Sequence, residues 1–506
     1  MGFEFRNLPN LLLIEEGSLR RYSLPIMQKI HKRKAIVSLI SSYASQFATT
    51  GANLATKLIV ARLIAPADLG LYAKALFIQM FCETVMDMGV TQHIAREDHR
   101  PYGTYLLLRV SLAVVLIAGI ELWAGRIGLW DGSIPPVVRM LIVVLLIKSL
   151  SGVPNLYLDR ELMIHRSVVP QLLRLLSTGV VSIGLARMGM GVWALVYGTI
   201  TGELVFAATM WQAAWGRMPI RLSWEHAGSL IWGSKYLFLI AIMGFALQQG
   251  SIAITGTLLT NQEVGYYAMA SSLVIILSRV VEAAVYRVIY PLFCEYSDNL
   301  HNLGRLFRRA TLAVYAVEAP VYFYVCLYAP VVVPLVLGRK WWPAAALMQA
   351  LSVAGIVNPL CTFGSEILRA KKYDGMLTFS NIVSAVTLMG AGYFLTRRFG
   401  AMGMVAANYV IIGAIPVVVV LLRLIREDVY RLVWQLAFVY AASLAGLMLA
   451  GRATEGHRMI QALVGMAVIP GLWMVFYRVF FRELGSRTLG ELRSPVPEEV
   501  ELGTNA

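Results

Sequence analysis

Long apolar segments recur along the whole chain, and they restrict its possible folds more than any other feature of the sequence. Each is about 20 residues long, which is enough to cross a hydrocarbon core of about 30 Å as a helix. Because backbone groups in lipid need hydrogen-bond partners within the protein, such segments fold as helices. We therefore predict an all-α polytopic membrane protein with about fourteen transmembrane helices. They cover approximately residues 36–62, 69–92, 104–125, 135–154, 168–186, 191–214, 232–259, 264–290, 310–337, 343–368, 375–396, 403–423, 432–450 and 459–481.

The composition agrees with a membrane protein. Only 14% of the 506 residues are charged, against about 25% in an ordinary globular domain. The formal net charge of +15 comes from Lys and Arg residues dispersed between the apolar segments. Nucleic-acid-binding proteins typically carry a stripe of basic residues with interleaved aromatic residues. The basic residues of this sequence form no such stripe, so we predict no nucleic-acid partner.

One pattern in the apolar background occurs twice. The segment ARLIAPADLGLYAKAL at 61–76 aligns without a gap with GTLLTNQEVGYYAMAS at 256–271, at an offset of 195 residues. The alignment pairs Gly70 with Gly265 and acidic Asp68 with Glu263. An acid suits a helix N-terminus, and small residues let two membrane helices approach closely. Each copy is predicted to form the outer turn between an odd-numbered helix and the next.

A second match indicates that the chain is duplicated. MGVWALVY at 190–197 aligns with MGMVAANY at 402–409, at an offset of 212. A chance match between apolar sequences is the alternative, but both matches fall at equivalent places in the helix count. Two six-helix bundles that each start inside imply parallel repeats, related by an axis along the membrane normal. We predict a tail over 1–34, an N-lobe over 35–215, a linker over 216–231, a C-lobe over 232–424, a further helix pair over 425–482 and a tail over 483–506.

The connections between spans are short, so the positive-inside rule applies to them. Basic residues gather in alternate loops, for example at 305–309 and 369–372. With the N-terminus inside, most of these loops are cytoplasmic, and both termini are predicted to be cytoplasmic in a multi-pass protein of the cell inner membrane. The basic cluster KIHKRK at 29–34 is expected beside anionic lipid headgroups.

Four motifs make the chain similar to a known family. They are ARLIAPADLGLYAKA at 61–75, MDMGVTQHIAR at 86–96, LYLDRELMIHR at 156–166 and GMGVWALVYG at 189–198. With these the chain resembles polysaccharide transporters of the superfamily that groups multidrug exporters, oligosaccharide-lipid flippases and the lipid II flippase. The resemblance covers about 35–480 and implies two six-helix lobes in a V, an added C-terminal helix pair and alternating access around a central cavity.

Ionisable residues inside the spans are the best functional candidates, since they are costly in lipid and usually face a cavity or a partner. A cationic, substrate-binding cavity is predicted from Lys57, Arg62, Lys74, Lys148 and Arg279. Arg62 and Lys74 lie near the outer boundary, so the alternative for them is that they extend to the interface. The other three lie deeper.

The acidic candidates for ion coupling or charge balance are Glu83, Asp87, Glu282 and Glu318. The repeat offset of 195 pairs Asp87 with Glu282, which places an acid at the same depth in both lobes. Arg279 precedes Glu282 by three residues, so the alternative for these two is an intrahelical ion pair. We predict no cofactor and no metal ion.

A cationic cavity suits the pyrophosphate of a lipid-linked oligosaccharide, because Lys and Arg bind phosphate oxygens. The leading hypothesis is a flippase for undecaprenyl-pyrophosphate-linked repeat units in O-antigen, capsule or exopolysaccharide assembly, coupled to H⁺ or Na⁺. A polysaccharide polymerase and export machinery are further candidate partners. A multidrug exporter is the alternative that an acid-dominated cavity would favour. A glycan polymerase or glycosyltransferase would need catalytic groups on a sizeable outer loop, whereas the outer loops are short, so no enzyme is predicted.

Overall fold

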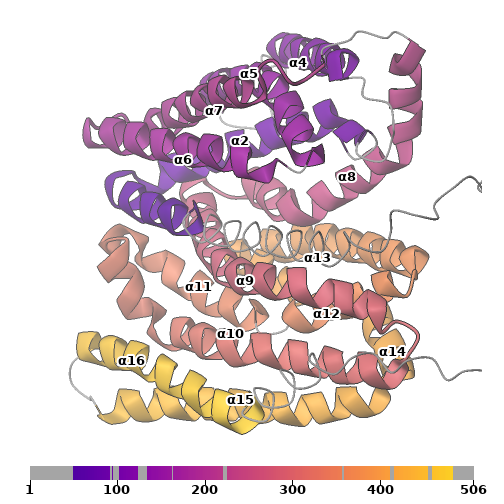
Figure 1. Ribbon diagram of the computed structural model, residues 1–506. Helices are drawn as coiled ribbons and strands as arrows, with labels where there is room; N and C mark the ends of the chain where they lie inside the picture. The colour runs from indigo at the N-terminus through magenta and orange to yellow at the C-terminus, as the bar shows by residue number, and fades with distance from the viewer. Residues whose placement is uncertain are drawn as a thin grey trace, which may run out of the picture. The chain divides into compact units, whose positions relative to one another are not determined.

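The structure is a computed structural model that describes residues 49–91, 94, 102–123, 134–161, 163–219, 225–355, 358–410, 415–453 and 458–481. All regular elements within these ranges are helices (Figure 1), which confirms the predicted all-α class. A first helix is described over 49–63. It is followed by α2 (Pro66–Asp87), α4 (Tyr102–Trp123), α5 (Ile134–Arg160), α6 (Ile164–Arg187), α7 (Val192–Ala214), α8 (Glu225–Leu258), α9 (Asn261–Glu295), α10 (Leu300–Val336), η1 (Arg339–Trp341), α11 (Trp342–Gly355), α12 (Asn358–Ala370), α13 (Asp374–Asn408), α14 (Ile415–Leu424), α15 (Arg426–Ala453), α16 (Arg458–Phe476) and η3 (Tyr477–Phe481).

Ten of the described helices are long and apolar enough to span a membrane. The chain is therefore a multi-pass membrane protein, as predicted, while the total of fourteen spans stays a prediction. Several helices extend beyond the apolar segments from which they were predicted. The helix predicted from residue 310 begins at Leu300, because the Asn299 side chain accepts a hydrogen bond from the Asn302 amide and caps a polar first turn.

Two of the predicted helix boundaries can be compared with the structure. The helices predicted over 375–396 and 403–423 meet at Gly400, whose φ of 62° and ψ of −146° are not helical, so α13 joins the first of them to the start of the second. The span predicted over 343–368 corresponds to α11 and α12, and residues 356–357 between them lie outside the described residues.

The helices before α8 pack mainly on one another. α7 packs against α5 and α6, and α5 also packs against α2 and α4. Leu71, Met86, Leu141 and Val196 share one buried cluster built from α2, α5 and α7. We call this group of helices the N-lobe, and it leaves one side of α2 for contacts with α8 and α9.

The later helices form a second group and carry the C-terminal pair. α9 and α10 pack against α11, and α13 packs against α8. α15 packs on α10 and α16, as the lower part of Figure 1 shows. Arg308 on α10 lies 3.2 Å from Asp428 on α15 and joins the added helix pair to the rest, with both side chains largely buried. The expected helix pair is therefore attached through α10.

The two copies of the repeated segment contact each other. A Cβ atom built on Gly70 would lie 1.7 Å from the backbone oxygen of Asn261, and one built on Gly265 would lie 1.9 Å from the backbone oxygen of Pro66. Asn261 and Pro66 are themselves related by the offset of 195. Such reciprocal contacts are what a two-fold relation between equivalent segments produces. The glycines allow α2 and α9 to approach closely, as the sequence predicted.

A second pair of equivalent positions corrects the alignment of MGVWALVY at 190–197 with MGMVAANY at 402–409. Gly191 precedes α7 with φ 55° and ψ −129°, which is close to the conformation of Gly400. A Cβ built on Gly191 would lie 2.9 Å from the Asp68 carboxylate, and one on Gly400 would lie 4.0 Å from the Glu263 carboxylate. Gly191 therefore corresponds to Gly400, at an offset of 209, and the sequence-derived offset of 212 was one helical turn too long.

Candidate functional site

A polar cavity of about 560 Å³ lies between the N-lobe and α8. Among the described lining residues, the charged side chains come from three N-lobe helices, α2, α4 and α5, and α8 supplies the opposite wall. The lining residues are Met80, Glu83, Thr84, Asp87, Arg109, Lys148, Ala241, Gly244, Phe245, Gln248 and Gln249. The size and the few convergent polar groups are typical of a ligand pocket.

Asp87 is the most highly connected of these residues. Its Oδ1 atom accepts hydrogen bonds from Arg109 Nη1 at 2.9 Å, from the Tyr105 hydroxyl at 2.8 Å and from the Thr91 hydroxyl. Arg109 also donates to the Tyr105 hydroxyl at 2.7 Å. The Arg109 side chain is only 7% exposed, whereas that of Asp87 is 25% exposed. The pair is therefore held by α4 and open to the cavity on the α2 side.

Gly152 on α5 leaves the space that the Arg109 guanidinium occupies. A Cβ atom at this position would lie 2.9 Å from Arg109 Cζ. Arg109 Nε is buried and has no hydrogen-bond partner among the residues that the structure describes. The guanidinium is thus positioned by close packing on one side and by Asp87 on the other.

A second ion pair lies one helical turn earlier on α2. Lys148 Nζ on α5 is 2.7 Å from Glu83 Oε2, and Gln79 donates to the same oxygen at 3.3 Å. Lys148 is 20% exposed and Glu83 is 35% exposed, so this pair is wetter than the first. Because Glu83 and Asp87 are four residues apart, they lie on the same face of α2 and both reach the cavity.

The cavity is charge-balanced and not cationic as a whole. Its described lining has two basic side chains, Arg109 and Lys148, and two acidic ones, Glu83 and Asp87. Both bases are already bound to carboxylates. An anionic ligand must therefore compete with Asp87 and Glu83 for the same donors, a condition that the sequence did not reveal.

The α8 wall is different in character. Gln248 and Gln249 bring amide groups to the cavity next to the ring of Phe245. The Phe245 ring packs against Phe77 and Phe81 of α2, with centroid separations of 5.4 and 5.6 Å. This wall offers uncharged hydrogen-bonding groups and an aromatic surface opposite the ion pairs.

Four of the other candidate residues lie elsewhere. Lys57 lies half-buried on the helix 49–63 and does not line the described cavity. Arg62 and Lys74 bind backbone carbonyls at a separate junction between α2, α8 and α10, and Glu318 is buried within α10. Arg279 and Glu282 belong to α9, but their side chains lie outside the described residues. Of the nine candidates, the structure brings together Lys148, Glu83 and Asp87.

Arg109 is the functional candidate that sequence reasoning missed. It interrupts the apolar run LLLRVSLAVVL on α4, and an arginine inside such a run is the signal that would have found it. Its partner Asp87 lies 22 residues earlier on a different helix, so their pairing is a property of the tertiary structure. No group of three or more His, Cys, Asp or Glu side chains suited to a metal ion occurs among the residues that the structure describes.

The sequence is similar to a family model and to proteins named for polysaccharide biosynthesis. The model of a family described as "Polysaccharide biosynthesis protein" matches residues 59–346. The succinoglycan biosynthesis transport protein ExoT of Rhizobium meliloti is 23% identical over 358 residues, which are 69% of this chain and 72% of ExoT. The lipopolysaccharide biosynthesis protein WzxC of Escherichia coli is 22% identical over 371 residues, 70% of this chain and 73% of WzxC.

Solved structures show a similar fold at low sequence identity. The lipid II flippase MurJ in an inward closed conformation matches with a TM-score of 0.68 at 11% identity, covering 89% of this chain and 99% of MurJ. An inward-facing multidrug transporter of the MATE family matches with a TM-score of 0.56 at 18% identity, covering 76% of this chain and 95% of that protein. These likenesses establish the fold expected from the sequence motifs.

Proposed function

Because the chain belongs to the polysaccharide biosynthesis protein family, we propose that it is a flippase for polyprenyl-pyrophosphate-linked oligosaccharide repeat units. It would carry them across the inner membrane for O-antigen, capsule or exopolysaccharide assembly. The observation that carries the proposal is the cavity of about 560 Å³ with two ion pairs on one wall and amide and aromatic groups on the other. Relatives named as a transport protein and as a lipopolysaccharide biosynthesis protein support it.

One cavity wall suits the pyrophosphate of such a substrate, and the other suits its sugars. The Arg109 guanidinium and the Lys148 ammonium can donate to phosphate oxygens, and Arg can do so bidentately. The amides of Gln248 and Gln249 can pair with sugar hydroxyls, and the Phe245 ring offers an apolar face. The polyprenyl tail stays in lipid throughout, so the protein has to enclose the headgroup alone.

Binding of the pyrophosphate would release two carboxylates. When phosphate oxygens replace Asp87 and Glu83 as acceptors, each carboxylate loses the basic side chain with which it is paired. A free carboxylate in a closed cavity is costly, so it would take up H⁺ or a Na⁺ ion. Asp87 and Glu83 are therefore our proposed coupling groups, and neither ion is preferred by this reasoning.

Four further predicted residues keep their proposed roles. Lys57 and Arg279 are proposed substrate contacts, and Glu282 and Glu318 are proposed coupling or charge-balancing acids. The cytoplasmic location of both termini is likewise part of the proposal. Translocation itself needs no covalent step, only alternating exposure of the cavity to the two sides.

Loss of each cavity cation tests the proposal. A deletion strain would be complemented with Arg109→Gln or Lys148→Gln, and lipid-linked repeat units and surface polysaccharide would be measured. One charge-assisted hydrogen bond contributes about 1.5–3 kcal/mol, so each variant should lower export by about tenfold or more. The matched control is Arg139→Gln, since Arg139 also joins α5 to α4, through Glu121 at 3.0 Å, but both side chains are about half exposed.

The outcomes separate the proposal from its alternative. We expect lipid-linked repeat units to accumulate in the two cavity variants and not in Arg139→Gln. Normal surface polysaccharide in both cavity variants at normal protein levels would refute the assignment of the cavity. Unchanged polysaccharide together with increased drug susceptibility in the deletion strain would indicate a multidrug exporter instead.

A further inference from the structure

Several basic side chains join the two lobes at the junction of the repeated segments, well away from the cavity. Lys340 in η1 donates to the carbonyl oxygens of Arg62 at 2.9 Å and Ile64 at 2.7 Å. In return, Arg62 donates through Nε and Nη2 to the carbonyl oxygens of Val336 and Leu335 at the end of α10. Each lobe thus binds the backbone of the other.

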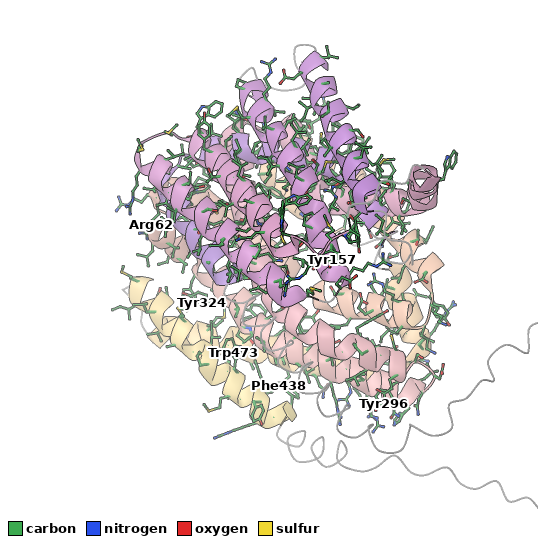
Figure 2. The ribbon with its side chains drawn as sticks, turned by 45° about the horizontal axis from the view of Figure 1, so that its top comes forward. Arg62, Tyr157, Tyr296, Tyr324, Phe438 and Trp473 are labelled. Carbon is green, nitrogen blue, oxygen red and sulfur yellow. The ribbon has the colours of Figure 1, made fainter. Side chains whose placement is uncertain are left out.

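Two further bonds cross the same junction. The indole Nε1 of buried Trp341 donates to the Ala61 carbonyl at 2.8 Å. On the other side of the repeat contact, Lys74 Nζ of α2 donates to the Leu259 carbonyl, just after α8, at 3.3 Å. Figure 2 labels Arg62 on the side of the view opposite Tyr296, which follows α9.

All of these acceptors belong to helix C-termini. The last four carbonyls of a helix have no partner within it, and the helix dipole makes this end attractive to cations. The helix 49–63, α8 and α10 end at this junction, and each receives a basic side chain from the opposite lobe. A side chain that merely extended to the lipid interface, the alternative weighed for Arg62 and Lys74, would not bind a carbonyl of the other lobe.

The junction closes one end of the protein while the cavity lies toward the other. Gly70 and Asp87 are 17 residues apart on α2, which corresponds to about 25 Å along a helix. Under the proposed topology, the end with Gly70 is the outer one. Partial burial lowers the pKa of Lys340, and the nearby Asp68 carboxylate offsets part of this effect.

We propose that Arg62, Lys74, Lys340 and Trp341 form a latch that holds the outer ends of the two lobes together. The latch must break each time the outer side opens, because every one of its bonds joins the N-lobe to the C-lobe. Arg62 and Lys340 are partly exposed to water, so their bonds can be exchanged for water, which suits a reversible closure. The role of the latch in transport rests on the proposed flippase function.

Cross-linking across the junction tests the latch without any substrate. Ala67 and Gln262 are exposed, equivalent positions in the two repeats, one residue after Pro66 and Asn261. Both would be changed to cysteine in a full-length protein whose four native cysteines are replaced by alanine. The rate of reaction with a short bifunctional thiol reagent would be measured in vesicles of phosphatidylethanolamine and phosphatidylglycerol.

We expect fast cross-linking in the parent. In Arg62→Gln and in Lys340→Gln the rate should be about tenfold lower, because hydrogen bonds from charged donors are at the strong end of the hydrogen-bond range. Lys340→Arg should retain most of the parent rate. Arg339→Gln is the matched control, because it removes the neighbouring exposed cation of η1 and leaves the four latch residues in place.

Parent-like rates in both latch variants, or a parent that does not cross-link, would overturn the proposal. Elution of each variant as a single species in size-exclusion chromatography shows that it has folded. Because the assay contains no lipid-linked glycan, a failed latch would leave the flippase proposal standing. A failed glycan-export experiment would likewise leave the cross-linking result intact.

Discussion

The glycine contact between the repeats predicts that Gly70→Ala destabilises the protein. Helix propensity alone predicts the opposite effect. Replacing Gly by Ala within a helix normally stabilises it by about 0.5–1 kcal/mol. At Gly70 the new Cβ would lie 1.7 Å from the Asn261 backbone oxygen, and real Cβ contacts are essentially never shorter than 3.0 Å. The oxygen must therefore move by at least the difference, 1.3 Å. Since it belongs to the backbone of α9, no rotamer change can relieve the clash.

The consequences reach the neighbouring bonds of the latch. Lys74 Nζ lies 3.3 Å from the Leu259 carbonyl, so separation of α2 from α9 and α8 by more than 1 Å would break this bond or weaken it. Overpacking of a well-packed contact costs about 1–3 kcal/mol. The gain in helix propensity offsets part of this cost. Gly70→Ala should therefore destabilise the closed junction by about 1–2 kcal/mol, which corresponds to a change of roughly five- to thirtyfold in the equilibrium constant for closure.

The assay is the cross-linking rate of the 67/262 cysteine pair, together with the thermal midpoint of unfolding in detergent. Gly265→Ala should behave like Gly70→Ala, because its Cβ would lie 1.9 Å from the Pro66 oxygen. The double variant should cost less than the sum of the two, since they disrupt one shared contact. Gly119→Ala on α4 is the control, because nothing lies within 4 Å of its new Cβ. Parent-like cross-linking and unfolding for Gly70→Ala would refute the close approach of the repeats.

Three further substitutions test contacts away from the junction of the repeats. Gly152→Ala should displace the Arg109 guanidinium and lower glycan export several-fold without loss of folded protein, as measured by surface polysaccharide and protein level. Arg308→Leu leaves Asp428 largely buried without its cation and should lower the free energy of unfolding by about 3 kcal/mol, measured by thermal or denaturant unfolding. Tyr328→Phe removes a buried bond of 3.0 Å to a carbonyl of α15 and should cost only about 1 kcal/mol in the same measurement.

The charged residues show where sequence reasoning succeeded and where it stopped. Because any ionisable group in an apolar segment stands out, Lys148, Glu83 and Asp87 were identifiable one at a time. Their pairing was not, since lipid and protein interior are both apolar and a membrane helix shows little contrast between its faces. The pairing of Asp87 with Arg109 depends on how α2 and α4 are rotated against each other.

The repeated segment shows the same division. The sequence by itself determined a polytopic helical protein, since segments of this length and polarity fold as membrane helices, and it determined the offset of 195 that relates Gly70 to Gly265. Only the tertiary structure decided that these two glycines meet, that Arg62 and Lys74 bind carbonyls of the opposite lobe, and that the cavity is charge-balanced. The reason is physical: the apolar segments specify what enters the membrane, whereas the partner of each polar group is fixed only when the helices pack.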